Sequence, residues 1–501
     1  MIHSQIGQLF NVNPCYTGEI EGNLNNPSET YKGAINIEFE PSGNFKINTQ
    51  ILKNSVSGKQ ELESIQIKAS QGKISNISFS KNIDISDVTD NLPLPFNLKL
   101  HIEAFEFEHN LDTEVKYWIF PLTNFIADFI QEYSDLNYPY QAEAIKAKFF
   151  PHRLINFRLR NNQCWIEPLS DYEERKKKLI SGEICCTITS IMVGEIDSMS
   201  INSDDINKDF TFNLLNVLGL ATGTQIQASW IEFRDANYQL IKRIHWNIQP
   251  IQYTKGHVAI KGNDLKPNSG IGHLLEKSLS SIDFNKPHLQ NSLTYNILGG
   301  NPNQYLEFRK INFILALDML SRFYGYERQD LKEGLENSEI DTINGYLNNA
   351  SRQIQSLAND AKAAGNFDKS QIIGKIADRT KQIPVSIDRS FGLTVVKLIK
   401  HFNLLDSDII TEYYGDNHRD FARVLSYYRG AIIHEGYFNF DSEDYNFEDV
   451  VRVLKHLHDI LIRLNLIMLE YRGHYITPIS NSPKLVNWVN VSTLASELGY
   501  K

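Results

Sequence analysis

The sequence predicts an α+β fold in which a β-rich N-terminal region precedes a C-terminal bundle of helices. Apolar and polar residues alternate along roughly the first 120 residues, which places one set of side chains on a core and the other in water. From about residue 303 onward, apolar residues recur at three- and four-residue steps, as on the buried stripe of a helix. A chain of 501 residues is too long for one core and indicates several domains.

The N-terminal alternation occurs in short segments separated by turn-forming residues such as those of Pro41–Gly43. The segments are Ile35 to Phe39, Phe45 to Ile47, Ile65 to Ile67, Ile77 to Phe79, Phe96 to Leu100 and Phe105 to Phe107. Short strands at this spacing predict an antiparallel sandwich or barrel-like sheet.

The stretch from about residue 120 to 290 is mixed in character. We expect a short helix over Leu122 to Gln131, strands over Cys185 to Val193 and Gln225 to Phe233, and a helix over Asp209 to Leu220. Residues 1–302 are expected to form the β-rich N-terminal region, with a subdomain break near 120–170.

Residues 303–501 are expected to form the helical domain. Short links join its amphipathic segments, which predicts a bundle in which each helix buries its stripe against the others. The expected helices are Leu306 to Phe323, Ile343 to Thr380 with a break at residues 364–366, Ile387 to Phe402, Phe421 to Ile433, and Phe447 to Tyr471.

Composition excludes several classes of protein. The net charge of −10 argues against broad nucleic-acid affinity but permits a small local site. The four cysteines form no C-x-x-C pair, so we expect no metal site, and their scarcity fits a reducing cytoplasm. No apolar run reaches the ~20 residues of a membrane span, and the N-terminus does not resemble a signal peptide. No phosphate-binding loop is complete, so no cofactor is expected.

The candidate catalytic residues are Arg429 and His434, near the end of a predicted helix. A histidine near neutral pKa can move protons at a ribose 2′-OH and a leaving oxygen, and an arginine can hold a phosphate with two donors. Residues five apart on an α-helix are ~140° apart around the axis and ~7.5 Å apart along it. The arginine must therefore reach along the helix, or the last turn must unwind. Gly436 is a natural stop for this helix.

This stretch resembles the R-x(4–6)-H motif of HEPN ribonucleases, and the order of regions is similar to that of the ApeA-like abortive-infection proteins. The resemblance implies a HEPN bundle over residues 303–501 and metal-independent cleavage of RNA, with transfer RNA anticodon loops as the target. It also implies a homodimer or higher homo-oligomer in which two motifs form one cleft, and anti-phage defence triggered by a phage protein. Many family members place Asn, Asp or His after the arginine, where this chain has Gly430.

Four further residues near the motif are expected to contact RNA: Arg423, Tyr427, Tyr428 and Tyr437. Aromatic rings can stack on bases of a single strand, and an arginine adds positive potential. A structural interpretation stays open for the motif itself, in which His434 packs at a helix end and Arg429 pairs with an acidic neighbour.

Two other functions stay open at the level of sequence. The bundle can be a catalytically weak scaffold that binds RNA without cutting it, and Gly430 is the residue that favours this hypothesis. The N-terminal region can also be a ligand- or carbohydrate-binding β-domain with a helical oligomerisation tail.

Overall fold

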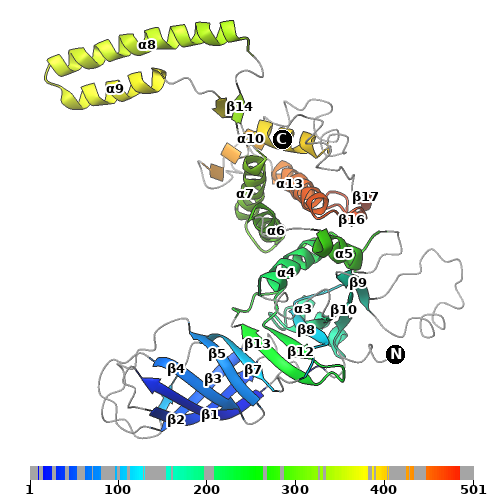
Figure 1. Ribbon diagram of the computed structural model, residues 1–501. Coiled ribbons are helices and arrows are strands. Elements are labelled where there is room, and N and C mark those ends of the chain that lie inside the picture. Colours follow the sequence, from blue (N-terminus) through cyan, green and yellow to red (C-terminus); the bar gives the residue numbers. More distant parts are fainter. Residues whose placement is uncertain are drawn as a thin grey trace, which may run out of the picture. The chain divides into compact units, whose positions relative to one another are not determined.

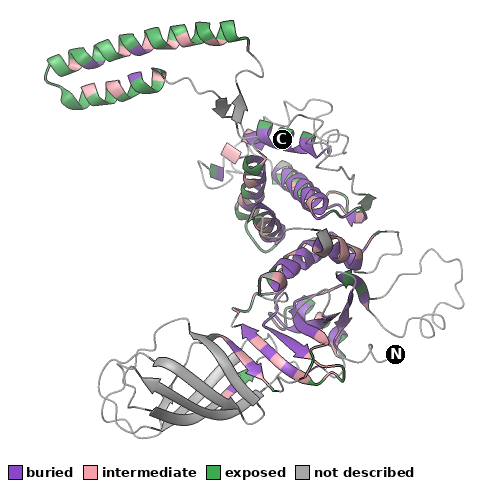
Figure 2. Ribbon diagram, viewed as in Figure 1, coloured by how far each residue is buried: buried purple, intermediate pink, exposed green. Residues whose placement is uncertain are grey.

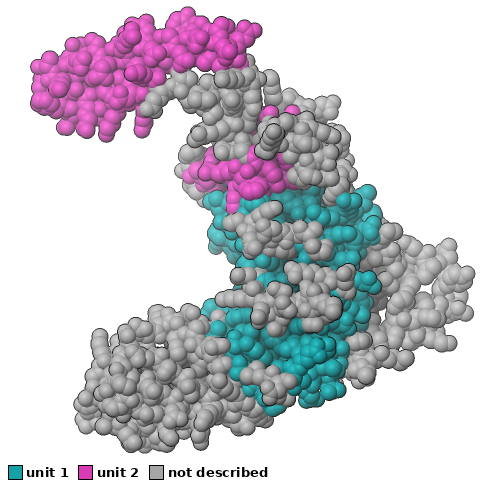
Figure 3. Space-filling view, in the orientation of Figure 1, with its two compact units in different colours: residues 1–316, 439–490 teal, residues 317–438, 491–501 magenta. Residues whose placement is uncertain are grey.

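The computed structural model divides the chain into two compact units (Figure 3). Unit 1 comprises residues 1–316 and 439–490, and unit 2 comprises residues 317–438 and 491–501. These units divide the chain differently from the expected domains, whose boundary at residue 303 stays a prediction. The structure describes every residue except 1–9, 11–14, 25–29, 40–44, 53–61, 70–71, 80–95, 99–101, 110–112, 128, 130–153, 160–161, 197–207, 247, 263–267, 282–286, 325–327, 331–334, 382–385, 389–390, 403, 405–424, 428, 431, 434–446 and 486–501.

Among the described residues of unit 1, thirteen strands form one antiparallel sheet (Figure 1). Their order across the sheet is β6-β3-β2-β1-β4-β5-β7-β13-β12-β8-β11-β10-β9. The strands are β1 (Cys15–Leu24), β2 (Thr30–Phe39), β3 (Phe45–Leu52), β4 (Leu62–Ala69), β5 (Gly72–Phe79), β6 (Phe96–Leu98), β7 (Ile102–Glu108), β8 (Tyr117–Thr123), β9 (Ile155–Leu159), β10 (Asn162–Pro168), β11 (Ile188–Glu195), β12 (Trp230–Arg234) and β13 (Leu240–Trp246).

The register of the N-terminal strands explains the alternation in the sequence. Ile37 of β2 is paired with Ile47 of β3 on one side and with Tyr16 of β1 on the other, and it is fully buried. Phe105 of β7 pairs with His245 of β13 in the same way and is also fully buried. Cross-strand neighbours of this kind stabilise a sheet. The expected strands are confirmed as an antiparallel sheet followed by mostly helical structure, which is an α+β fold.

Strands β8 and β11 are buried on both faces, unlike the alternating edge strand β9 (Figure 2). The expected helix over Leu122 to Gln131 is wrong because Leu122 and Thr123 are the last residues of β8. Asn124 then takes a positive φ of 65°, and its backbone N–H donates to the Thr187 carbonyl. The backbone N–H and carbonyl groups at this point bond to other strands of the sheet. Such tertiary hydrogen bonds override a helical pattern in the sequence.

Helices pack on this sheet and on one another. α5 (Ile271–Ser281) contacts β9, α4 (Lys208–Thr222) contacts both α5 and α6 (Pro287–Gly300), and α6 contacts α13 (Phe447–Met468). The remaining elements of unit 1 are α3 (Tyr172–Ser181), the first part of α7 (Leu306–Phe323), β16 (His474–Ile476) and β17 (Pro483–Leu485). The predicted helices at residues 209–220, 306–323 and 447–471 are confirmed, with small changes at their ends.

Gly223 ends α4 in a conformation that requires glycine. Its φ is +68°, and an added Cβ would lie 2.1 Å from the His257 carbonyl oxygen. Both the left-handed backbone and the close approach of a second chain segment exclude a side chain. The position holds the loop that contains His257 against the end of α4.

Unit 2 contains a long helical hairpin of α8 (Asn337–Ala363) and α9 (Phe367–Lys381), which confirms the predicted break at residues 364–366. Small buried residues line the contact between the two helices, and the Ser351 hydroxyl donates to the Ala377 carbonyl at 2.7 Å. The unit also includes β14 (Arg328–Asp330), β15 (Ser386–Asp388) and α10 (Phe391–His401).

Two glycines of this hairpin should respond in opposite directions to alanine. Gly365 turns the chain with a φ of +77°, so Gly365→Ala should destabilise the hairpin by about 1 kcal/mol. Gly345 lies within α8 and an added Cβ would meet no described atom within 4 Å, so Gly345→Ala should stabilise it by about 0.5–1 kcal/mol. Amide hydrogen exchange across α8 and α9 measures both changes, and equal signs would contradict the assigned backbone conformations.

Candidate functional site

The motif segment is helical where the structure describes it. Residues 425–427 and 429–430 are α-helical, and residues 432–433 form a π-helical turn. Leu425 and Ile432, seven positions apart, are both buried, whereas Tyr427 and Ile433 are exposed. Seven residues make two helical turns, so one face of the segment is fixed in the core and the other is open to solvent.

The motif segment is tied to the first turn of α10. The backbone N–H of Gly392 donates to the Ser426 hydroxyl at 3.0 Å, which satisfies one of the amides that a helix N-terminus leaves without a partner. The guanidinium carbon of Arg429 lies 5.6 Å from the ring centroid of Phe391, a cation–π distance. The first contact fixes the motif segment against α10, and the second places the Arg429 guanidinium at the Phe391 ring.

Two groups add positive potential where Arg429 meets the first turn of α10. The arginine carries a full charge, and the N-terminus of α10 adds the partial positive charge of its helix dipole. Arg429 is half-buried, and its Nε atom is buried without a hydrogen-bond partner among the described residues. A cation fixed beside a helix N-terminus is the arrangement that binds phosphate groups.

The structure describes two of the predicted site residues, Arg429 and Tyr427. They are two positions apart on the helix, so they lie on different sides of it, and Tyr427 is 48% exposed. His434, Arg423, Tyr428 and Tyr437 lie outside the described residues.

Gly430 lies next to Arg429 with space around it. An added Cβ would meet no described atom within 4 Å, and the residue is only half-buried. The glycine is therefore not imposed by crowding from the described part of the chain.

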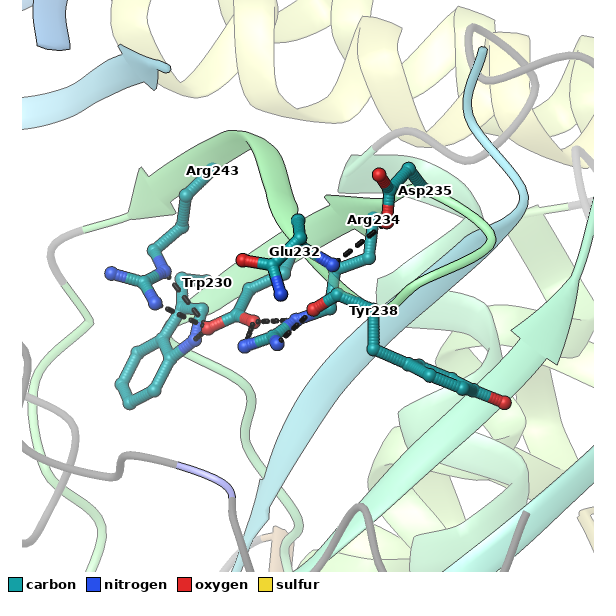
Figure 4. Close-up of polar contacts among 7 residues, drawn as sticks. Trp230, Glu232, Arg234, Asp235, Tyr238 and Arg243 are labelled. Atoms are coloured by element: carbon teal, nitrogen blue, oxygen red, sulfur yellow. Dashed lines mark hydrogen bonds and ion pairs between the residues drawn. The ribbon is translucent and has the colours of Figure 1, made fainter. Parts of the chain in front are cut away.

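Sequence reasoning missed a buried ion cluster on the β12–β13 hairpin (Figure 4). Glu232 is fully buried, and its Oε1 accepts hydrogen bonds from Nε and Nη2 of Arg243 at 2.9 and 2.6 Å. Its Oε2 accepts from Nε and Nη2 of Arg234 at 2.8 and 2.6 Å. The indole N–H of Trp230 donates to Oε1 at 3.2 Å. Every acceptor position of this carboxylate is directed at protein donors.

Burial alone would raise the pKa of Glu232, but the two guanidinium groups outweigh burial and lower it. A carboxylate held ionised by two arginines is a poor proton acceptor, so the cluster is structural rather than a general base. The sequence carried a signal for it. Trp230, Glu232 and Arg234 share one face of a strand by period two, and Arg243 lies opposite Glu232 on the next strand.

A second polar group contains the half-buried His257 and the buried His458. The two rings meet edge to face at 5.8 Å, and the His458 ring stacks on Phe313 at 4.9 Å. His257 Nε2 lies 2.7 Å from the Ile476 carbonyl oxygen. Burial lowers the pKa of both histidines, and for His458 the charges of His257 and Arg309 lower it further. In the described part of the chain, no group of three or more His, Cys, Asp or Glu side chains could hold a metal ion.

These histidines predict loss of stability in acid. Their pKa is lower in the folded state than the ~6.5 of an unfolded chain, so the unfolded state binds more protons once the pH falls below that value. Stability should be fully present above about pH 6.5 and fall below it, by up to about 1.4 kcal/mol per pH unit for each histidine. Urea unfolding of the full chain at pH 7.5 and 5.5 measures the difference. His458→Gln should flatten the profile, and an unchanged slope would contradict this assignment.

No described helix is both long enough and apolar enough to cross a membrane. Comparison with protein-family models, with curated proteins and with solved structures found no match for this chain. The resemblance to HEPN ribonucleases therefore rests on the motif in the sequence.

Proposed function

We propose that this protein is a metal-independent endoribonuclease of the HEPN type, in which Arg429 and His434 carry out cleavage. The observation that carries the proposal is the Arg-x4-His motif in a helical segment near the end of the chain. Two features of the described structure support it. Arg429 lies at the N-terminus of α10, and Tyr427 of the same helical segment is exposed.

A π-helical turn at residues 432–433, inside the five-residue spacing of the motif, is a further feature that supports the proposal. In an α-helix the backbone hydrogen bond joins residues four apart, and side chains five apart point ~140° apart around the helix axis. A π turn joins residues five apart and so places them on nearly one face. π turns inside α-helices are frequent at functional sites.

The proposed reaction is attack of a ribose 2′-oxygen on the adjacent phosphorus. The 2′-O–P bond forms, the P–O5′ bond breaks, and the products end in a 2′,3′-cyclic phosphate and a 5′-hydroxyl. His434 takes the 2′-OH proton or gives one to the departing 5′-oxygen. Arg429 binds the phosphate oxygens and stabilises the charge that develops on them. DNA lacks the 2′-OH, so the reaction selects RNA.

One histidine does not readily serve as both base and acid in one turnover, so the proposal includes a homodimer in which two motifs face one cleft. The substrate proposed is transfer RNA, whose anticodon loop presents unstacked bases and free 2′-OH groups. The site of action proposed is the bacterial cytoplasm, with cleavage triggered by a phage protein during abortive infection. These parts of the proposal come from the resemblance to the ApeA-like family.

The alternative is a scaffold that binds RNA without cutting it, and Gly430 favours this alternative. The open space at Gly430 allows a direct test, because the polar residue found in many family members can be placed there. Gly430→Asn should leave the fold intact and raise the cleavage rate if the site is catalytic. Gly430→Ala is the matched control, since it fills the same space without a polar group. Absence of cleavage by both variants would favour the scaffold.

The direct test compares the wild-type chain with an Arg429→Ala, His434→Ala double variant on total bacterial transfer RNA. Each is assayed alone and with an extract of phage-infected cells as a source of activator. We expect fragments from the wild type and none from the double variant. Equal cleavage by the two proteins would remove the site assignment, and binding without cleavage in both assays would establish the scaffold.

A further inference from the structure

Two adjacent cysteines in unit 1 point toward each other at the surface. Cys185 and Cys186 lie between α3 and β11, and their Sγ atoms are 3.7 Å apart. Neighbouring side chains of an extended strand point to opposite faces, so this convergence depends on the bend at residues 183–185. Cys185 is exposed, Cys186 is 7% exposed, and both carry reduced thiols. One sulfur is therefore open to solvent, and the second lies directly behind it.

The backbone on both sides of the pair is anchored. The Cys185 carbonyl accepts the Tyr253 N–H at 2.6 Å. Thr187 and Asn124 share two hydrogen bonds. The Thr187 N–H donates to the Asn124 side-chain oxygen, and the Thr187 carbonyl accepts from the Asn124 backbone N–H. Arg175 donates to the Thr187 hydroxyl at 2.9 Å and to the Ile188 carbonyl at 3.1 Å. Reacting groups held close by a fixed framework react much faster than the same groups free in solution.

We propose that Cys185 and Cys186 are a reversible redox-modification site that closes to a disulfide between adjacent residues when the protein meets a peroxide. The exposed Cys185 thiolate attacks one oxygen of hydrogen peroxide, forming a sulfenic acid and releasing hydroxide, which takes a proton to become water. The Cys186 thiol then attacks the sulfenic sulfur, the S–S bond forms, and a second water leaves. Two thiols are oxidised by two electrons and one peroxide is reduced to two waters.

The closed form should be easily reduced. A disulfide bond is ~2.05 Å long, so the sulfurs must approach each other by well over 1 Å from their present 3.7 Å. Adjacent Cα atoms are ~3.8 Å apart across a trans peptide, closer than the ~4.4–6.8 Å usual for a disulfide. Strained and exposed disulfides have high reduction potentials and belong to the labile, regulatory class. Cellular thiols would therefore return the pair to its open state.

Cys164 supplies an internal control. It is fully buried in β10, and burial raises the pKa of its thiol far above the ordinary value, so little thiolate forms. It should not react under conditions that close the Cys185–Cys186 pair.

The test uses the full chain, reduced and then treated with hydrogen peroxide. Trypsin cuts after Lys178 and Lys208 and releases a peptide that holds Cys185 and Cys186 but neither Cys15 nor Cys164. We expect this peptide to lose about 2 Da, to resist alkylation, and to regain both thiols with dithiothreitol. Cys164→Ser should behave like the wild type, and Cys185→Ser and Cys186→Ser should each lack the mass loss. Tryptophan fluorescence, compared with the wild type, verifies that each variant is folded.

Three results would overturn the proposal. They are alkylation of both cysteines after peroxide treatment, oxygen addition at Cys185 without loss of two hydrogens, and cross-linking of separate chains through Cys185. The last two would show that the exposed thiol reacts by itself and that the 3.7 Å approach of the two sulfurs has no chemical consequence.

Discussion

Glu232→Gln is expected to destabilise unit 1 by about 3–5 kcal/mol, because it removes the buried carboxylate that pairs with both Arg234 and Arg243. The neutral amide is nearly the same size, so packing changes little. The amide carries no charge, so it cannot neutralise the guanidinium groups of Arg234 and Arg243, whose side chains are 19% and 6% exposed. The loss of these two buried ion pairs carries most of this cost.

Tryptophan fluorescence during urea unfolding measures the loss. Trp118, Trp165, Trp230 and Trp246 all lie in strands of the sheet of unit 1, so the signal reports on that unit. Glu106→Gln is the matched control, since Glu106 pairs with Lys242 at 2.6 Å on the same sheet but is partly exposed. That variant should lose less than about 1 kcal/mol. Equal losses in the two variants would show that the Glu232 cluster has no special role.

Arg429→Ala is expected to reduce RNA cleavage by about 10²–10³-fold, the usual effect of removing one group that stabilises transition-state charge. The loss should appear mainly in kcat, because the charge on the phosphate oxygens increases as the reaction proceeds. Arg429→Lys should recover only part of the rate, since an ammonium group lacks the two-pronged geometry of guanidinium. Initial rates with a single RNA substrate measure these effects.

Arg352→Ala is the matched control for this prediction. Arg352 is an exposed arginine on α8 in the same unit, outside the motif segment. Its removal changes the net charge by the same amount and leaves the contact between Arg429 and Phe391 unchanged. An equal fall in rate with Arg352→Ala would mean that general positive charge, rather than a placed arginine, supports the reaction.

Much of the fold was predictable because it is local in the sequence. The alternation from Ile35 to Phe107 marked the N-terminal strands, and the break at residues 364–366 marked the helical hairpin, where Gly365 takes a left-handed turn. The helix expected at Leu122 failed because distant partners decide that backbone. Thr123 pairs with Gln227, and Asn124 with Thr187, and no local pattern encodes such pairings.

The candidate site was predictable only in part, for the same reason. The spacing of Arg429 and His434 is visible in the sequence, but the contact of Arg429 with Phe391 joins residues 38 positions apart. The cluster at Glu232 was within reach of sequence reasoning, because Glu232 and Arg234 are two apart on a strand and Arg243 follows across a short hairpin. The convergence of Cys185 and Cys186 depends on a backbone bend that their adjacency alone does not predict.

The most direct test of the central claim is analysis of the RNA ends made by the purified chain in EDTA, beside His434→Ala. Total transfer RNA is incubated with each protein, with phage-infected cell extract as activator, and the fragments are examined for terminal phosphates. We predict 2′,3′-cyclic phosphate and 5′-hydroxyl ends from the wild type and intact RNA from the variant. Cleavage that EDTA abolishes, or cyclic phosphate ends made equally by His434→Ala, would contradict a metal-independent reaction at this motif.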